Sequence, residues 1–199
     1  MSKIKICGLK RKEDIEYVNL AKPDYAGFVF AGIKRKIDFQ TAANFRSLLN
    51  KNIKSAGVFV NEPIENIISL CKDKTIDIIQ LHGNENEQYI DALRQKADNK
   101  IIKSVVVNQT SKLPGFQTSN IDFLLFDSGM GSGETFDWDL IKGYDKPFFL
   151  AGGLNKDNIA KALKTLKPYC VDLSSGVETN GLKDFEKIKE IIEIIRSIK

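Results

Sequence analysis

The chain has 199 residues, of which 42% are hydrophobic and 28% are charged, so a disordered, collagen-like or disulfide-scaffold protein is excluded. This length favours one domain, residues 1–199, with a single buried core. The formal net charge is only +4 and the basic residues are spread along the chain, which favours a small anionic ligand over nucleic acid as the partner.

Membrane and export segments are not expected. The longest apolar runs are far shorter than the roughly 20 residues of a membrane span or the roughly 7 to 15 of a secretory signal. The opening MSKIKICGLK has no apolar stretch behind its lysines, so we expect the chain to begin directly on structure. The 3 cysteines form no CxxC pair, which argues against disulfides and structural zinc. A cytoplasmic protein without a metal site is therefore expected.

Eight short β-rich apolar runs recur roughly 20 to 30 residues apart, which is about the length of a strand, a helix and two loops. They begin near Ile4, Tyr25, Ser55, Asp77, Ile101, Asp122, Pro147 and Cys170. This spacing predicts an α/β fold, a compact single-domain (β/α)8 TIM barrel. A doubly wound open sheet is the alternative.

Helical segments are expected between most of these strands because apolar residues recur there at three- and four-residue spacing. The segments are Glu13–Leu20, Gln40–Leu49, Ile64–Lys72, Glu87–Lys96, Lys156–Leu166 and Lys183–Ile198. Between Val107 and Asp122, Pro114 and Gly115 interrupt any helix, so we expect the fifth helix to be degenerate.

Catalytic residues of such barrels lie at the carboxyl ends of the strands. Strand periodicity places Lys5 and Cys7 on one face of the first strand, and a lysine beneath the thiol would lower its pKa. Asp127 ends the sixth strand, so a thiol and a carboxylate would face one substrate as base and acid. The alternatives are a buried core thiol and an aspartate that only caps a turn. The glycine-rich segment from Gly129 to Thr135 is expected to close over a ligand.

Two glycine-bearing turns follow the seventh and eighth strands, where such barrels commonly bind phosphate through backbone N–H groups. Their candidate residues are Gly152, Gly153, Ser174, Ser175 and Gly176. Ordinary turns between strands and helices are the alternative.

Two further side chains are candidates for contact with the substrate. Arg35, within a basic triplet, would bind a carboxylate through its guanidinium, or simply lie in a solvated loop. His82, the single histidine, ends the fourth strand, where it would contact substrate or only orient the loop, and it makes a poor metal site.

Several segments together resemble the phosphoribosylanthranilate isomerase family of tryptophan biosynthesis. They are KICGL from Lys5, GFVF from Gly27, GVFVN from Gly57, QLHG from Gln80, GSG from Gly131 with TFDW from Thr135, GGL from Gly152 and VDLSSGVE from Val171. The resemblance runs in order from Lys3 to Lys183. Ala151 replaces an expected serine, and the loop around Arg35 departs from the family pattern.

The resemblance implies an Amadori rearrangement of N-(5-phosphoribosyl)anthranilate without a cofactor. It implies that Asp127 protonates the furanose ring oxygen and that Cys7 removes the proton from C2 of the sugar. It further implies that the glycine and serine turns bind the phosphate, with Asp172 near the ribose hydroxyls and Arg35 on the anthranilate carboxylate. The expected partner is a small phosphoribosyl compound, not nucleic acid or a membrane, and the expected state is a monomer or homodimer.

Three other functions are weighed against this one. A ribulose-phosphate epimerase would need metal-binding histidines, which this chain lacks, and the histidine-pathway isomerase pairs two aspartates, whereas the first strand here ends in Cys7. A phosphosugar-binding barrel without turnover is the third. Both presumed catalytic residues are present, which disfavours it.

Overall fold

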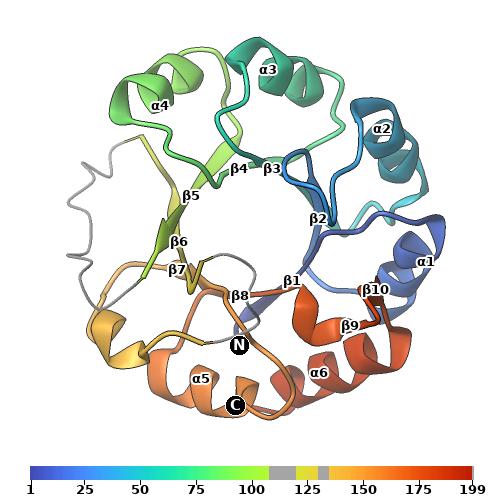
Figure 1. The fold of residues 1–199 in the computed structure, drawn as a ribbon, viewed down its shortest axis with the longest axis vertical. Coiled ribbons are helices and arrows are strands. Elements are labelled where there is room, and N and C mark those ends of the chain that lie inside the picture. Colours follow the sequence, from blue (N-terminus) through green and yellow to red (C-terminus); the bar gives the residue numbers. More distant parts are fainter. Residues whose placement is uncertain (108–119, 130–134, 199) are drawn as a thin grey trace.

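The computed structural model, which describes residues 1–107, 120–129 and 135–198, contains a closed barrel of eight parallel strands (Figure 1). The strands are β1 (Lys3–Cys7), β2 (Tyr25–Val29), β3 (Lys54–Phe59), β4 (Ile78–Leu81), β5 (Lys100–Val106), β6 (Phe123–Asp127), β7 (Phe148–Leu150) and β8 (Cys170–Leu173). Closure comes from the pairing of β8 with β1, in which Lys5 is in register with Asp172. The barrel prediction is confirmed, and the open sheet is wrong.

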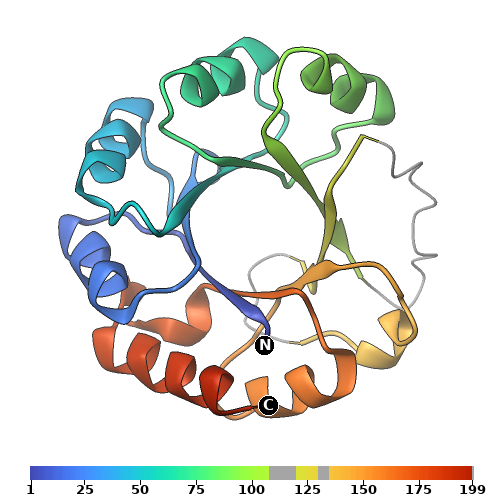
Figure 2. The ribbon, with the colours of Figure 1, turned by 180° about the vertical axis from the view of Figure 1, so that it is seen from behind.

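Helices surround the barrel, as the view from behind also shows (Figure 2). They are α1 (Lys12–Ala21), α2 (Phe39–Leu48), α3 (Ile64–Lys72), α4 (Glu87–Arg94), α5 (Ile159–Leu166) and α6 (Phe185–Ser197), with short 3-10 helices η1 (Trp138–Ile141) and η2 (Ser175–Val177). A hairpin of β9 (Glu178–Thr179) and β10 (Leu182–Lys183) follows η2. None of the described helices is long and apolar enough to cross a membrane.

The helix predictions are confirmed, with shifts of a few residues at the ends. The largest shift is at α5, which begins at Ile159 and not at Lys156. There the Asn155 side chain accepts hydrogen bonds from the backbone N–H groups of Asp157 and Asn158, so these residues form a turn ahead of the helix. The predicted degenerate fifth helix falls mainly on residues 108–119, which lie outside the described residues.

Two apolar layers result from the alternation of side chains along each strand. One lies between barrel and helices, and α6 contributes Ile188, Ile191, Ile192 and Ile195 to it. The other fills the barrel interior, with Ile78, Ile102, Leu125, Phe149 and Cys170 among its members. Because this apolar layer closes the interior, the polar groups that a ligand can reach lie at the mouth, where the strands end.

Candidate active site

A cavity of about 350 Å³ opens at the carboxyl ends of the strands. The last residue of β1 and the loops that follow β2, β3, β4, β6, β7 and β8 all contribute to its lining. The predicted site residues that line it are Cys7, Arg35, His82, Asp127, Gly152, Gly153, Asp172, Ser174 and Ser175. Parallel strands in one closed ring bring their carboxyl ends to one rim, so residues far apart in sequence share this cavity.

Gly176 is the one predicted site residue that does not line the cavity. It packs against the backbone carbonyl of Leu154, and a Cβ at this position would overlap that oxygen. Gly176 therefore joins the loop after β8 to the loop after β7. Its contribution to the site is the close approach of two backbones.

Cys7 reaches the cavity although it is only 8% exposed. Beneath it, Lys5 is fully buried and its Nζ donates to Oδ2 of Asp172 at 2.7 Å. Burial raises the pKa of the Cys7 thiol above its ordinary value, and the Lys5 ammonium opposes that rise. The lysine thus acts in the expected direction, but burial outweighs it, so the expected lowering of the thiol pKa is wrong.

Asp127 lies across the cavity, at the end of β6, and is held by its neighbours. Its Oδ1 accepts the backbone N–H of Gly129 at 3.1 Å, and Nε2 of His82 lies 3.6 Å from its Oδ2. The other ring nitrogen of His82, Nδ1, lies 2.8 Å from Oγ of Ser104 and 3.2 Å from the amide nitrogen of Gln80. With that amide as donor, Nδ1 is the acceptor and the ring proton lies on Nε2, toward Asp127.

Burial lowers the pKa of His82, while the Asp127 carboxylate opposes that effect. At 3.6 Å from Oδ2 of Asp127, Nε2 of His82 is beyond hydrogen-bond distance, so the ring lies beside the carboxylate without a hydrogen bond to it. His82 lines the cavity next to Asp127.

The loops after β7 and β8 present backbone to the cavity. Gly152 has a φ of +83° and Gly153 a φ of +61°, conformations that glycine adopts without steric cost. A Cβ on Gly152 would lie 2.6 Å from the backbone nitrogen of Ser128. These glycines leave the rim unobstructed, and exposed backbone in such turns suits an anion.

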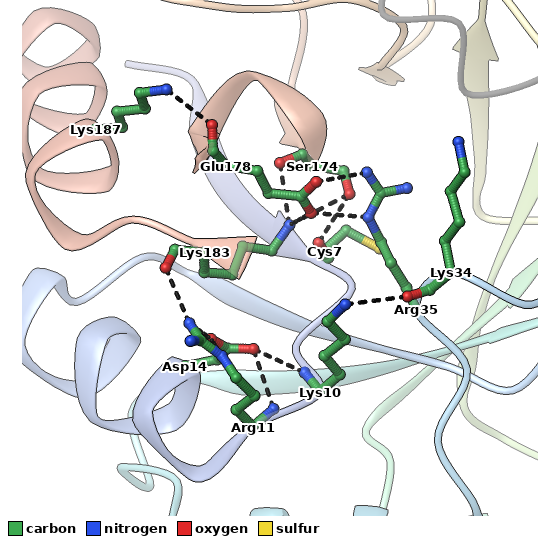
Figure 3. A network of polar contacts seen from close by, with 10 residues as sticks. All are labelled: Cys7, Lys10, Arg11, Asp14, Lys34, Arg35, Ser174, Glu178, Lys183 and Lys187. Carbon is green, nitrogen blue, oxygen red and sulfur yellow. Dashed lines mark hydrogen bonds and ion pairs between the residues drawn. The ribbon is translucent and has the colours of Figure 1, made fainter. Parts of the chain in front are cut away.

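Arg35 lies between β2 and α2 and forms a bidentate ion pair with Glu178 (Figure 3). Its Nε and Nη2 donate to Oε1 and Oε2 of Glu178, each at 2.8 Å. The aliphatic part of the Arg35 side chain packs directly against Gly8, where a Cβ would overlap Cδ of the arginine. Apolar residues from β2, β3 and the loops that follow these strands line the same cavity, namely Val29, Ala31, Ile33, Val58 and Val60. A cation beside an apolar wall suits an aromatic carboxylate.

Two buried oxygens at the mouth have no hydrogen-bond partner in the described part of the chain, Oε1 of Gln80 and Oδ1 of Asp172. Both residues line the cavity, and both oxygens accept hydrogen bonds. Hydroxyl groups of a ligand would satisfy them.

The sequence interpretation assigned no role to Gln80, Ser104, Glu178 or Lys183. Strand parity was a sufficient signal for Gln80, which lies on β4 two residues before His82 and therefore shares its face. For Glu178 and Lys183 the signal was Asn180-Gly181 between two short segments, a typical hairpin turn. The predicted closing segment, Gly129 to Thr135, lies largely outside the described residues, which omit 130–134.

Comparison with known proteins identifies the family. Residues 4–194 match the family model described as N-(5'phosphoribosyl)anthranilate (PRA) isomerase. A relative from Endomicrobium trichonymphae, named N-(5'-phosphoribosyl)anthranilate isomerase, is 60% identical over 203 residues, with 100% of both chains covered.

Solved structures agree with this match. Phosphoribosyl anthranilate isomerase from Thermotoga maritima superposes with a TM-score of 0.88 at 33% identity, covering 99% of this chain and 100% of that one. A phosphoribosyl anthranilate isomerase in complex with reduced 1-(o-carboxyphenylamino)-1-deoxyribulose 5-phosphate has a TM-score of 0.86 at 32% identity, with the same coverage. The chain therefore belongs to the N-(5'-phosphoribosyl)anthranilate isomerase family.

Proposed function

We propose that the chain converts N-(5'-phosphoribosyl)anthranilate into 1-(2-carboxyphenylamino)-1-deoxyribulose 5-phosphate, with Asp127 as general acid and Cys7 as general base. Family membership makes it an aldose–ketose isomerase of tryptophan biosynthesis. One observation carries the assignment of roles: a thiol on β1 and a carboxylate on β6 line the same cavity. An acid and a base on opposite sides of one substrate are what this rearrangement requires.

The proton transfers balance within the substrate. Asp127 gives a proton to the furanose ring oxygen, the bond between C1 and that oxygen breaks, and a protonated Schiff base forms between C1 and nitrogen. Cys7, as thiolate, takes the proton from C2. The electron pair of the broken C2–H bond moves toward the iminium and gives an enolamine. Ketonisation then moves the proton held by Cys7 to C1 and the proton of the C2 hydroxyl to Asp127, which returns both groups to their starting states. C2 is oxidised and C1 reduced, so no external oxidant enters.

The remaining contacts follow from the shape and charge of the cavity. We assign the phosphate to the rim formed by Gly152, Gly153, Ser174 and Ser175, with Gly176 joining the two loops. Oδ1 of Asp172 and Oε1 of Gln80 would accept hydrogen bonds from the ribose hydroxyls. Arg35 would bind the anthranilate carboxylate, with the apolar wall against the aromatic ring.

We further propose that residues 1–199 form one domain that acts in the cytoplasm as a monomer or homodimer, with neither nucleic acid nor membrane as partner. A Thermotoga maritima relative is described as dimeric. No feature of the cavity favours the epimerase, the histidine-pathway isomerase or the phosphosugar-binding barrel.

The test is the loss of anthranilate fluorescence when purified protein receives N-(5'-phosphoribosyl)anthranilate without added metal or cofactor. Cys7→Ala and Asp127→Asn should each lower kcat by about 10²-fold or more, because each removes one proton-transfer group. Cys71→Ala, a change in a half-buried cysteine on α3, is the control and should keep its rate. Wild-type turnover in both site variants would rule out these roles.

A further inference from the structure

We propose that the β9–β10 hairpin is a clamp that fixes Arg35, and that Glu178 and Lys183 are positioning residues that set the preference for a carboxylate-bearing substrate. This inference rests on the proposed function, in which Arg35 binds the anthranilate carboxylate. Neither Glu178 nor Lys183 lines the cavity. They would act on the substrate only through Arg35.

The local sequence builds the hairpin. Asn180 and Gly181 have φ values of +53° and +75°, the left-handed conformations that a two-residue hairpin turn requires. Lys183 is consequently paired in register with Glu178 across the two strands. Lys183 Nζ lies 2.6 Å from Oε1 of Glu178, and the lysine side chain is 1% exposed.

The Glu178 carboxylate thus lies between two cations, with Lys183 on one side and Arg35 on the other (Figure 3). The bidentate contact occupies Nε and Nη2 of Arg35, so the guanidinium plane is fixed. In the described part of the chain, the third nitrogen, Nη1, has no hydrogen-bond partner, which leaves donors for a ligand. An arginine in a loop that also holds Ile33, a side chain 96% exposed, would otherwise sample many rotamers.

The clamp is also tied to the end of β1. Lys183 Nζ donates to the backbone carbonyl of Ser174 at 3.0 Å, and Oγ of Ser174 donates to the backbone carbonyl of Cys7 at 3.0 Å. These bonds link the hairpin, the loop after β8 and the strand that carries the thiol. Fixing Arg35 to Glu178 therefore fixes it relative to Cys7.

Glu178 keeps its charge at any physiological pH. Burial alone would raise its pKa, but Arg35 and Lys183 outweigh burial and lower the pKa to about 2. Replacing the carboxylate with an amide would leave two cations facing each other and release Arg35 from its bidentate geometry.

The experiment compares two inhibitors by competition against substrate. One is reduced 1-(o-carboxyphenylamino)-1-deoxyribulose 5-phosphate, and the other is its phenylamino counterpart, which lacks the carboxylate. The proteins are wild type, Glu178→Gln, Arg35→Ala and the double variant. Glu190→Gln, which removes a carboxylate from an exposed ion pair with Lys156, is the matched control.

Glu178→Gln should weaken the carboxylate-bearing inhibitor about 10-fold or more, raise KM and change kcat little, while the counterpart binds within about twofold of wild type. In the Arg35→Ala background, Glu178→Gln should add nothing, because the group through which it acts is gone. Glu190→Gln should match wild type. Glu178→Asp keeps the charge but shortens the side chain by one methylene group, and it should show the same selective loss. It replaces Glu178→Gln in the experiment if the amide variant does not fold.

Equal weakening of both inhibitors, or a full effect of Glu178→Gln without Arg35, would overturn the clamp. An active wild-type chain that binds both inhibitors equally would overturn the clamp together with the carboxylate role of Arg35. A wild-type chain that does not isomerise N-(5'-phosphoribosyl)anthranilate would instead reject the proposed function.

Discussion

Nε2 of His82 lies 3.6 Å from Oδ2 of Asp127, while Nδ1 of the same ring lies 2.8 Å from Oγ of Ser104. The imidazole thus lies between a hydroxyl on β5 and the carboxylate at the end of β6. A histidine held on one side has its other nitrogen oriented, so the direction in which Nε2 of His82 faces Asp127 depends on Ser104, a residue that does not line the cavity.

Ser104→Ala should therefore lower kcat by about 10-fold and leave KM nearly unchanged, because the hydroxyl acts on the orientation of His82 and not on substrate binding. Steady-state kinetics on N-(5'-phosphoribosyl)anthranilate measures both constants. Ser69→Ala, on the exposed face of α3, removes a matched hydroxyl away from the mouth and should have no effect. An unchanged kcat in Ser104→Ala would show that the ring is held without this bond.

The pH dependence of kcat/KM should report the Cys7 thiol. Burial raises its pKa, and only the thiolate accepts the substrate proton, so kcat/KM should rise with pH through neutrality and level off above the ordinary range of a cysteine. Lys5 lowers the pKa of the Cys7 thiol, so removing this cation in Lys5→Met should raise that pKa and move the whole profile to higher pH. A profile that stays in place in Lys5→Met would mean that Cys7 is not the titrating base.

The same Lys5→Met change should destabilise the fold. It leaves Asp172 buried without its partner, and breaking a buried ion pair from one side costs about 3–5 kcal/mol. Urea unfolding measures this loss. Lys3→Met, which breaks a half-exposed pair with Asp24, is the control and should cost about 1 kcal/mol or less.

Gly152→Ala should weaken phosphate binding and lower stability. Its φ is +83°, and the added Cβ would lie 2.6 Å from the backbone nitrogen of Ser128, so the loop must move. Gly143→Ala is the matched control, since its φ is +90° with no atom within 4 Å of the added Cβ. Both variants should lose about 1 kcal/mol or more from the backbone conformation, but only Gly152→Ala should raise the Kd for inorganic phosphate in calorimetry. Equal phosphate affinity in both would place the anion elsewhere.

The stability contributed by Glu178 should depend on pH in acid. Its folded pKa of about 2 lies below the ordinary value of about 4.3, so the contribution is complete above about pH 4.3 and is lost as the pH falls toward 2. The free energy of unfolding of wild type should exceed that of Glu178→Gln near pH 6, and the difference should shrink toward pH 2. A difference that is constant with pH would mean that the carboxylate is not held as an anion in the folded chain.

The ring of strands was predictable because its signal is local and repeated. The periodicity of apolar residues in each strand or helix indicates which of its faces is buried. Eight such units at regular spacing are compatible with only a few folds. The same parity placed Cys7 and His82 at the mouth, and the strand ends placed Asp127 there. Each of these predictions used the sequence of only one strand, without any contact between strands.

The sequence by itself determined which side chains lie at the carboxyl ends of the strands. Tertiary structure decided how they pair. Whether burial or Lys5 has the larger effect on the Cys7 thiol, and whether Glu178 pairs with Arg35, depends on how closely segments more than 100 residues apart in sequence approach one another. Gly176 shows the same limit, since its contact with the Leu154 carbonyl exists only after two loops meet. Charge interactions and desolvation vary steeply with such distances, whereas strand and helix periodicity does not depend on them.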